Sequence, residues 1–376
     1  MRITVLNKIV VSFTLLLSLM LATTHVLAAS PAMLEAKQEA EAKGYIFFTA
    51  HDEIVAMAKK EGKLRVMFGL NPPTYKPLMN GFKQKYPFMT DIHVEEIRGE
   101  PAYQKFLLEI KAGQAKRWDI TFIPVDSPKE YMRYTMKHDI FGMAKHGVLK
   151  IHPGMIHLGE RNIITATSTL QVIAYNRKLI SDDKVPAKWE DFLKPEFKGR
   201  KFVLDIRPIG VASLVPAWGL ERTLDFARKI AAQQPVWARG GTRVTTAVAA
   251  GEYPLYYGPN YVNIRMAMSK DPTGNLSYKL AEPVPGRAVD SPHGILNTAD
   301  HPHAALLWLE FMVSPEGQEI IDKYEPLRAS VYTHGSVTEQ VTRGKERSMV
   351  DWDHFTKFQE YMGKIIEAYG FPKADK

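Results

Sequence analysis

The chain has 376 residues, of which 45% are hydrophobic and 24% charged, so we expect a globular protein with two domains. It contains no cysteine, which excludes disulfides, thiolate metal sites and cysteine nucleophiles. The net charge is +8, but the basic residues are scattered among acidic ones, so we expect a solvated surface, no nucleic-acid partner and a mild attraction for anions.

The first 29 residues have the pattern of an export signal. Arg2 and Lys8 flank the start of an apolar run from Ile9 to Leu21, and small residues of the kind found at cleavage sites precede Ala28. The run is shorter than the roughly 20 residues that a membrane span needs. We therefore predict a signal peptide over residues 1–29, cleaved near Ala28, and a periplasmic mature protein. A retained membrane anchor is the alternative.

A polar helical segment and an α/β unit come next. Residues 30–62 form the segment, which we interpret as an N-terminal helical appendage. Three strands alternating with helices then follow, at 64–68, 92–97 and 118–123. This order predicts a parallel sheet whose ligands lie beyond the carboxyl ends of its strands. Asn71 follows the first strand and Asp126 the third, so both are candidate ligand contacts.

Four histidines lie in the next segment, which is also rich in glycine. They are His138, His146, His152 and His157. Their spacings of eight, six and five residues are not the three or four of a helical metal pair. Loop histidines between two lobes are therefore favoured over a metal site.

An alternating strand over residues 163–176 organises the rest of the chain. Small and hydroxyl-bearing side chains occupy positions 165–169. We interpret the strand as a crossing from one α/β lobe to another, where small side chains leave room for a ligand. Ser168 and Thr169 are therefore candidate contacts at the floor of a cleft.

Two further strands each lead into a polar turn and a helix. The strand at 202–204 precedes Asp205–Gly210 and a helix predicted to reach Trp218, and the strand at 236–238 precedes Arg239–Thr242 and a second helix. Unpaired amides and the dipole at a helix start favour an anion. The candidate contacts here are Asp205, Arg207, Arg239 and Thr242.

Four tyrosines lie between residues 253 and 261. A strand ending near Gly258 would place Tyr257 or Tyr261 at the same carboxyl edge, where a tyrosine can hydrogen-bond or stack on a ligand. The alternative is an aromatic strand that packs on its own sheet. Extended chain then returns across the gap, Ser314 caps a helix that begins at Pro315, and residues 349–369 form a last amphipathic helix.

Five segments in this order resemble the extracellular solute-binding proteins of bacterial ABC importers. The similarity is greatest to the group that contains ferric-ion-binding proteins and relatives for small organic anions and polyamines. The segments are residues 58–64, 170–176, 189–199, 249–252 and 314–318, and the Trp189–Gly199 run is the most specific.

The resemblance implies an α/β, two-lobed type 2 periplasmic-binding-protein-like fold. Each lobe is a mostly parallel sheet flanked by helices, and two crossover strands form the hinge about which the lobes close on a ligand. The chain would leave the first lobe near Thr169 and return near Arg287. The implied boundaries are 63–169 and 287–376 for the first lobe and 170–286 for the second.

The resemblance also implies the partners: a small-molecule solute and the permease subunits of an ABC importer at the membrane. We expect a monomer without a cofactor or a resident metal, because such receptors bind and release their solute unchanged.

Ferric ion is one candidate solute. Ferric-binding relatives place two adjacent tyrosines after the Gly–Glu segment and a histidine after strand one; here those positions fall on Tyr261 and Val262, and the loop after strand one has no histidine. Tyr256 and Tyr257 are adjacent but five residues early, so the alternative ferric ligands are Tyr256, Tyr257 and Tyr261. Arg207 and Arg239 instead favour a small organic anion or oxyanion.

Other functions remain open from the sequence. A polyamine would need several carboxylates, and Asp126 and Asp205 are the candidates. The same pair would serve a secreted enzyme only if the two faced each other across the gap. A sensor that presents its loaded form to a membrane receptor is a third possibility.

Overall fold

The computed structural model describes residues 30–325 and 327–371, so the predicted signal peptide lies outside the described residues. The strands are β1 (Lys63–Phe68), β2 (Asp91–Glu96), β3 (Ile120–Phe122), β4 (Ile163–Ile164), β5 (Thr167–Asn176), β6 (Val203–Asp205), β7 (Val236–Ala238), β8 (Leu255–Asn260), β9 (Leu276–Lys279), β10 (Val284–Asp290), β11 (His293–Ile295) and β12 (Arg347–Val350).

The α-helices are α1 (Pro31–Ala42), α2 (His51–Glu61), α3 (Pro72–Lys85), α4 (Glu100–Lys111), α5 (Pro128–Met132), α6 (Ile140–Lys145), α7 (Ile209–Ala212), α8 (Val215–Trp218), α9 (Leu220–Ala232), α10 (Gly241–Ala250), α11 (Tyr261–Met268), α12 (Pro302–Val313), α13 (Pro315–Tyr324), α14 (Val337–Thr342), α15 (Trp352–Phe355) and α16 (Phe358–Tyr369). The 3-10 helices are η1 (Pro153–Met155), η2 (Trp189–Leu193) and η3 (Pro195–Phe197). In this described part of the chain, no helix is both long and apolar enough to cross a membrane.

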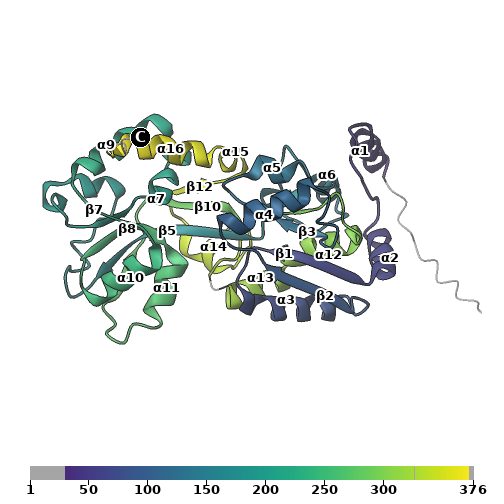
Figure 1. The fold of residues 1–376 in the computed structure, drawn as a ribbon, viewed down its shortest axis with the longest axis horizontal. Helices are drawn as coiled ribbons and strands as arrows, with labels where there is room; N and C mark the ends of the chain where they lie inside the picture. The colour runs from purple at the N-terminus through teal and green to yellow at the C-terminus, as the bar shows by residue number, and fades with distance from the viewer. Residues whose placement is uncertain (1–29, 326, 372–376) are drawn as a thin grey trace, which may run out of the picture.

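Two sheets lie side by side, each with its own helices (Figure 1). The first has the order β2-β1-β3-β11-β4, and the second has the order β12-β10-β5-β8-β6-β7, with β9 also paired to β5. Side chains alternate between the two faces of each sheet and are buried in a core on either face. Both faces of each sheet are therefore covered by helices. We call the first sheet with its helices the first body, and the second sheet with its helices the second body.

The β-α-β-α-β unit predicted for the first body is confirmed. β1 pairs in parallel with β2 over its whole length and with β3 at Val66, so the carboxyl ends of these strands share one edge. Leu78 and Phe82 of α3 are fully buried in the core of this sheet, as their helical spacing predicts.

The strand expected over residues 163–176 is two strands. β4 belongs to the first sheet and β5 to the second, and the chain bends between them. Thr165 lies at the bend, where its hydroxyl donates to the carbonyls of Asp290 and Thr167 at 2.7 and 3.1 Å. The helix expected to reach Trp218 is also divided, into α7 and α8, because Pro216 has no N–H to continue it.

β5 and β10 run antiparallel between the two bodies (Figure 1). Thr169 and Arg287, at which the sequence predicted the two crossings, are paired directly with each other. Further crossings lie near the C-terminus: β12 pairs with β10 in the second sheet, Phe355 of α15 packs in a core of the first body, and Phe358 of α16 packs in a core of the second. Residues 358–369 therefore lie against α9, whereas the sequence assigned 287–376 to the first lobe.

The segment predicted as an appendage also differs from expectation. Ile54 and Ala58 of α2 are fully buried in the same core as β1, and Glu61 accepts from the backbone amides of His303 and Ala304 at the start of α12. α2 is therefore an integral helix of the first body. Only α1, where Ala40 is the one residue classed as buried, stands apart at the edge (Figure 1).

His293 of β11 gives the first body a predicted sensitivity to acid. Its ring is buried between those of Phe68 and Phe122, with centroids 4.8 and 6.1 Å apart, and burial lowers the pKa of His293 to about 3. A histidine of the unfolded chain titrates near 6.5, so below that pH the unfolded state binds a proton that the folded state does not. The contribution of the buried, neutral His293 to the free energy of unfolding is therefore complete above about pH 6.5. It falls by about 1.4 kcal/mol per pH unit as the pH is lowered from 6.5 towards 3.

Urea unfolding of the protein and of His293→Leu between pH 7.5 and 4.5 measures this effect. We expect the free energy of unfolding of the variant to depend less steeply on pH, by about 1.4 kcal/mol per unit. The exposed His334 supplies the control, since His334→Leu should keep the original slope. Equal slopes for His293→Leu and the unaltered protein would contradict the assignment.

Candidate functional site

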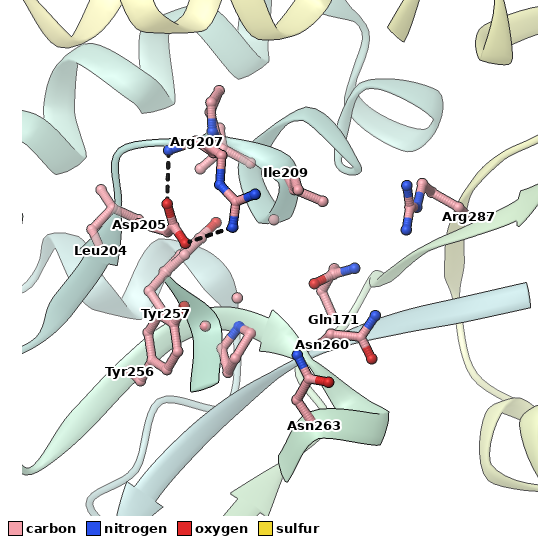
Figure 2. A pocket seen from close by; sticks show the side chains of 16 residues that line it. Gln171, Leu204, Asp205, Arg207, Ile209, Tyr256, Tyr257, Asn260, Asn263 and Arg287 are labelled. Atoms are coloured by element: carbon pink, nitrogen blue, oxygen red, sulfur yellow. Dashed lines mark hydrogen bonds and ion pairs between the residues drawn. The ribbon is translucent and has the colours of Figure 1, made fainter. Parts of the chain in front are cut away.

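A cavity of about 180 Å³ lies beyond the carboxyl ends of β6 and β8, where the second body meets the crossing strands. Figure 2 shows the arginines entering it from opposite sides, with amide side chains between them. Its lining includes the polar side chains of Gln171, Asp205, Arg207, Asn260, Asn263 and Arg287.

One side of the cavity is formed by the turn after β6. The Asp205 carboxylate accepts from the backbone N–H of Arg207 at 2.9 Å, and the Arg207 guanidinium lies 3.5 Å from its other oxygen (Figure 2). The Arg207 side chain is 52% exposed, so this ion pair is weak and the guanidinium can move at little cost. Arg207 therefore supplies a mobile positive charge and Asp205 a fixed negative one.

The opposite side is formed by Arg287 of β10. Its Nε donates to the Thr169 hydroxyl at 3.3 Å, and its Nη2 lies 2.9 Å from Asp290. Burial of Asp290 disfavours its charged form, but the guanidinium groups of Arg287 and Arg328 outweigh this and lower the pKa of Asp290. The carboxylate stays ionised and holds Arg287 in place.

Gln171 of β5 has an unusual environment for an amide. Its side chain is 2% exposed, and among the described residues its Nε2 has no hydrogen-bond partner. It follows Thr169 by two positions in the strand, and Thr169 is paired with Arg287 across the ladder, so all three side chains lie on the same face of the sheet. A buried, unpaired amide donor costs about 1–3 kcal/mol, so at the wall of a cavity this amide is available to an acceptor that enters it.

The helices that follow β7 and β8 contribute amide groups. Asn260 caps α11, because its Oδ1 accepts from the Val262 N–H at 2.9 Å, and this fixes its Nδ2 as a donor for other partners. Asn263 lies one turn further along the same helix, and Gly241 brings the first amide of α10 to the cavity wall.

Two glycines hold the wall of the cavity together. A Cβ on Gly210 would lie 2.9 Å from the Cα of Gly258, and Gly258 itself has a φ of 66°. Only glycine fits this contact, which presses α7 against β8. α7 has four residues, so the anion site expected at its start reduces to the turn that carries Asp205 and Arg207.

The two candidates from the first body lie outside the cavity. Asn71 begins α3 and donates twice to the buried Glu325, through its backbone N–H at 2.8 Å and its side chain at 2.6 Å. Asp126 is bonded by Gln359 of α16. Desolvation and the charge of Glu100 raise the pKa of Asp126, while the charges of Arg287 and Arg207 oppose this rise. Asp126 is thus within electrostatic reach of both cavity arginines.

The other predicted contacts apart from the tyrosines lie in different environments, and they do not line the cavity. Ser168 is fully buried with its hydroxyl between the Ala288 carbonyl and the Val331 N–H, both at 3.0 Å, so it has a structural role. Thr169 positions Arg287. Arg239 is exposed and outside the lining, and Thr242 lines a separate groove between α10 and α11.

Tyr256 and Tyr257 both line the cavity, whereas Tyr261 does not. Tyr256 and Tyr257 are consecutive in β8, so their rings lie on opposite faces of the sheet, in different cores. Tyr257 is packed among Trp189 and Phe192, and burial raises the pKa of Tyr257 well above its usual value. Tyr261 lies against Tyr278, with 3.5 Å between their hydroxyl oxygens.

Tyr257 nevertheless lines the cavity, and its buried hydroxyl has no hydrogen-bond partner among the described residues, so it remains a candidate contact. Tyr261 is not in the lining and packs on Tyr278. Tyr256 also lies in a core, where burial and the charge of Asp205 raise the pKa of Tyr256. Because the rings of Tyr256 and Tyr257 pack in different cores, they are not placed side by side as a pair of phenolate ligands for ferric ion.

The histidine-rich segment holds no metal cluster either. Throughout residues 30–325 and 327–371, no group of three or more His, Asp or Glu side chains is placed to hold a metal ion. His138 is buried, which lowers the pKa of His138 to about 3, and His157 packs against Trp352.

Sequence reasoning missed Gln171, Asn260 and Asn263 and treated Arg287 only as a crossing point. Gln171 could have been identified as a candidate contact from the sequence, since it is a polar residue between apolar neighbours in a predicted strand. Arg287 carried another, as a charged residue in the second predicted crossing.

Comparison with known families and structures agrees with this arrangement. The family described as bacterial extracellular solute-binding protein matches residues 137–357, which is more than half of the chain. None of the curated proteins matches it.

Several solved structures have the same two-lobed fold. The iron-bound HitA of Pseudomonas aeruginosa is 17% identical with a TM-score of 0.56, over 81% of this chain and 99% of that one. The IdiA (FutA) protein of Trichodesmium, in complex with iron and citrate, is 17% identical with a TM-score of 0.60, over 82% and 100%. An ABC-transporter substrate-binding protein of Agrobacterium tumefaciens is 16% identical with a TM-score of 0.58, over 82% and 94%. The predicted fold class is thus confirmed, and the chain belongs to the bacterial extracellular solute-binding proteins.

Proposed function

We propose that this protein is the periplasmic receptor of an ABC importer, which binds a small organic solute carrying a carboxylate or similar anionic group and delivers it to membrane permease subunits. Its family consists of transport receptors rather than enzymes. The proposed first lobe comprises residues 63–169 with most of 287–376, and the proposed second lobe comprises 170–286. Closure about β5 and β10 would bring Asp126 towards the cavity.

The observation that carries this proposal is the buried Gln171 amide beside Arg287 in one cavity. Its donor has no partner among the described residues, and an arginine with a fixed orientation lies on the opposite strand. An anionic group between the two would satisfy the amide and gain charge-assisted hydrogen bonds, and the closed lobes would exclude water from both.

Ferric ion and enzymatic turnover receive less support. The titles of two similar structures name iron, but Tyr256 and Tyr257 of this chain lie in different cores. Asp126 and Asp205 would need to face each other across a substrate to act as a catalytic pair, whereas each is engaged by a neighbour, Gln359 and Arg207 respectively.

Native mass spectrometry of the exported protein tests the receptor function, by detecting a small molecule that co-purifies with it. We expect a bound solute to be found, and we expect small-angle scattering to show a smaller radius of gyration when that solute is present. A protein that carries no solute and keeps its dimensions with every periplasmic extract fraction would contradict the proposal.

Gln171→Leu separates binding from folding. Loss of the amide should weaken solute binding by roughly tenfold or more, because a hydrogen bond to a charged group contributes about 1.5–3 kcal/mol. The same substitution removes an unpaired buried donor, so the urea-unfolding midpoint without solute should stay the same or rise. Calorimetry of the co-purified solute measures the first effect.

The control is Gln84→Leu, on the exposed part of α3 away from the cavity. It should leave both the solute affinity and the urea-unfolding midpoint unchanged. Unaltered affinity in Gln171→Leu would remove Gln171 from the site and with it the main support for this cavity.

A further inference from the structure

The positive charges of the cavity are already balanced. Arg207 faces Asp205, and Arg287 lies against Asp290, which also binds Arg328. Asp126 adds a carboxyl group from the first body, within electrostatic reach of both cavity arginines. A solute with two or more negative charges would therefore meet as many carboxylates as guanidinium groups.

The hydrogen-bond donors gather at the end near the crossing strands. Gln171 has an unpartnered Nε2 in the described structure, and Asn260 has its Oδ1 occupied by the Val262 N–H, which leaves its amino group to donate. Arg287 uses Nε and Nη2 for Thr169 and Asp290. These three side chains form a set of donors suited to a single carboxylate.

The acceptor at the other end is the carboxylate of Asp205, which the Tyr256 hydroxyl also contacts. Asp205 is held rigidly by the backbone N–H of Arg207, but its second oxygen is 3.5 Å from the Arg207 guanidinium, well beyond the roughly 2.7–2.9 Å of a charge-assisted hydrogen bond. Because the Arg207 side chain is half exposed, a cationic group of a solute can take its place beside that oxygen.

The size of the cavity limits the solute. About 180 Å³ is open to the centres of water-sized groups, well above the roughly 10–15 Å³ that one water molecule needs. This matches a chain of a few carbon atoms with a polar group at each end.

We infer that the solute is a small zwitterion, whose carboxylate binds at Gln171, Asn260 and Arg287 and whose cationic nitrogen binds at Asp205. This inference rests on the proposed receptor function and narrows the class of its substrate. A dicarboxylate of the same length would place a negative charge against Asp205, and a diamine would leave the donors at Gln171 and Asn260 unpaired in a closed site.

Calorimetry with matched probes tests the inference. The zwitterions are glycine, β-alanine and 4-aminobutanoate, the dianions are malonate and succinate, and the dications are 1,3-diaminopropane and 1,4-diaminobutane. We expect the best zwitterion to bind at least roughly tenfold more tightly than any dianion or dication. Asp205→Asn should weaken its binding by roughly 10- to 100-fold and narrow the gap to succinate.

The control is Asp225→Asn, which removes an exposed carboxylate of α9 that pairs with Lys229. It should leave the order of the probes unchanged. Tighter binding of succinate than of every zwitterion, or an Asp205→Asn variant with the original preference, overturns the zwitterion assignment while the receptor function stands. Absence of binding for all seven probes, with a co-purified solute that is not zwitterionic, overturns it as well. Absence of both binding and a co-purified solute overturns the receptor function itself.

Discussion

Replacing Arg328 by methionine is expected to lower the free energy of unfolding by about 3–5 kcal/mol. Arg328 lies between two buried carboxylates: its Nη1 is 2.5 Å from Glu325, and its Nη2 binds Asp290. Glu325 is fully buried and accepts from Asn71 and Thr74 as well. Without the guanidinium, two carboxyl groups remain in a low-dielectric interior with one positive charge, Arg287, beside Asp290 alone.

Urea or thermal unfolding, followed by circular dichroism, measures the loss. Arg343→Met is the matched control, because Arg343 is exposed and pairs with Glu339 within one helical turn, a solvent-screened contact that contributes little to stability. If Arg328→Met fails to express as a folded protein, the triple variant that also carries Asp290→Asn and Glu325→Gln should recover part of the stability. Equal stability of Arg328→Met and Arg343→Met would contradict the role of Arg328.

The second large effect is on binding. Arg287→Ala is expected to weaken solute affinity by about 2–5 kcal/mol, as removal of one partner of a desolvated charge pair does. This corresponds to a loss of roughly 30-fold or more. The protein should remain folded, because Arg328 still neutralises Asp290. Calorimetry of the co-purified solute measures the affinity, and circular dichroism measures the fold.

Arg222→Ala supplies the comparison for Arg287→Ala. Arg222 is an exposed arginine of α9 that covers the ring of Trp218, away from the cavity lining. Its removal should change the affinity by less than about twofold, in keeping with an exposed ion pair. An affinity that is as little affected in Arg287→Ala would show that the solute binds elsewhere.

The arrangement of strands and helices could be predicted from the sequence because it depends on the spacing of apolar residues over short stretches of the chain. The first three strands and the helices between them appear where the spacing of apolar residues predicts them, and Ser314 caps α13 as expected. Thr169 and Arg287 were identified as crossings and are paired. The elements depend on a few neighbouring residues each. The crossings follow from the five segments that resemble the solute-binding proteins and occur in the same order.

The cavity itself could be predicted only in part. Asp205 and Arg207 are neighbours in one turn, so local sequence is enough to bring them together. Gln171 and Arg287 come together through a strand pairing that joins residues over a hundred positions apart, which spacing cannot reveal. Tyr261 lies outside the cavity because it begins α11 and its ring packs on Tyr278, a contact that depends on how the helix docks on the sheet. The course of α16 likewise depends on which core offers its apolar face a partner.

The passage of the chain between Phe355 and Phe358 has a mechanical consequence. Two bodies joined at a pair of adjacent strands can twist and bend in several directions, whereas a further covalent tether away from that pair removes most of these freedoms. We expect the two bodies to rotate relative to each other about a single axis. A solute would then enter and leave along the single rim that lies farthest from residues 355–358.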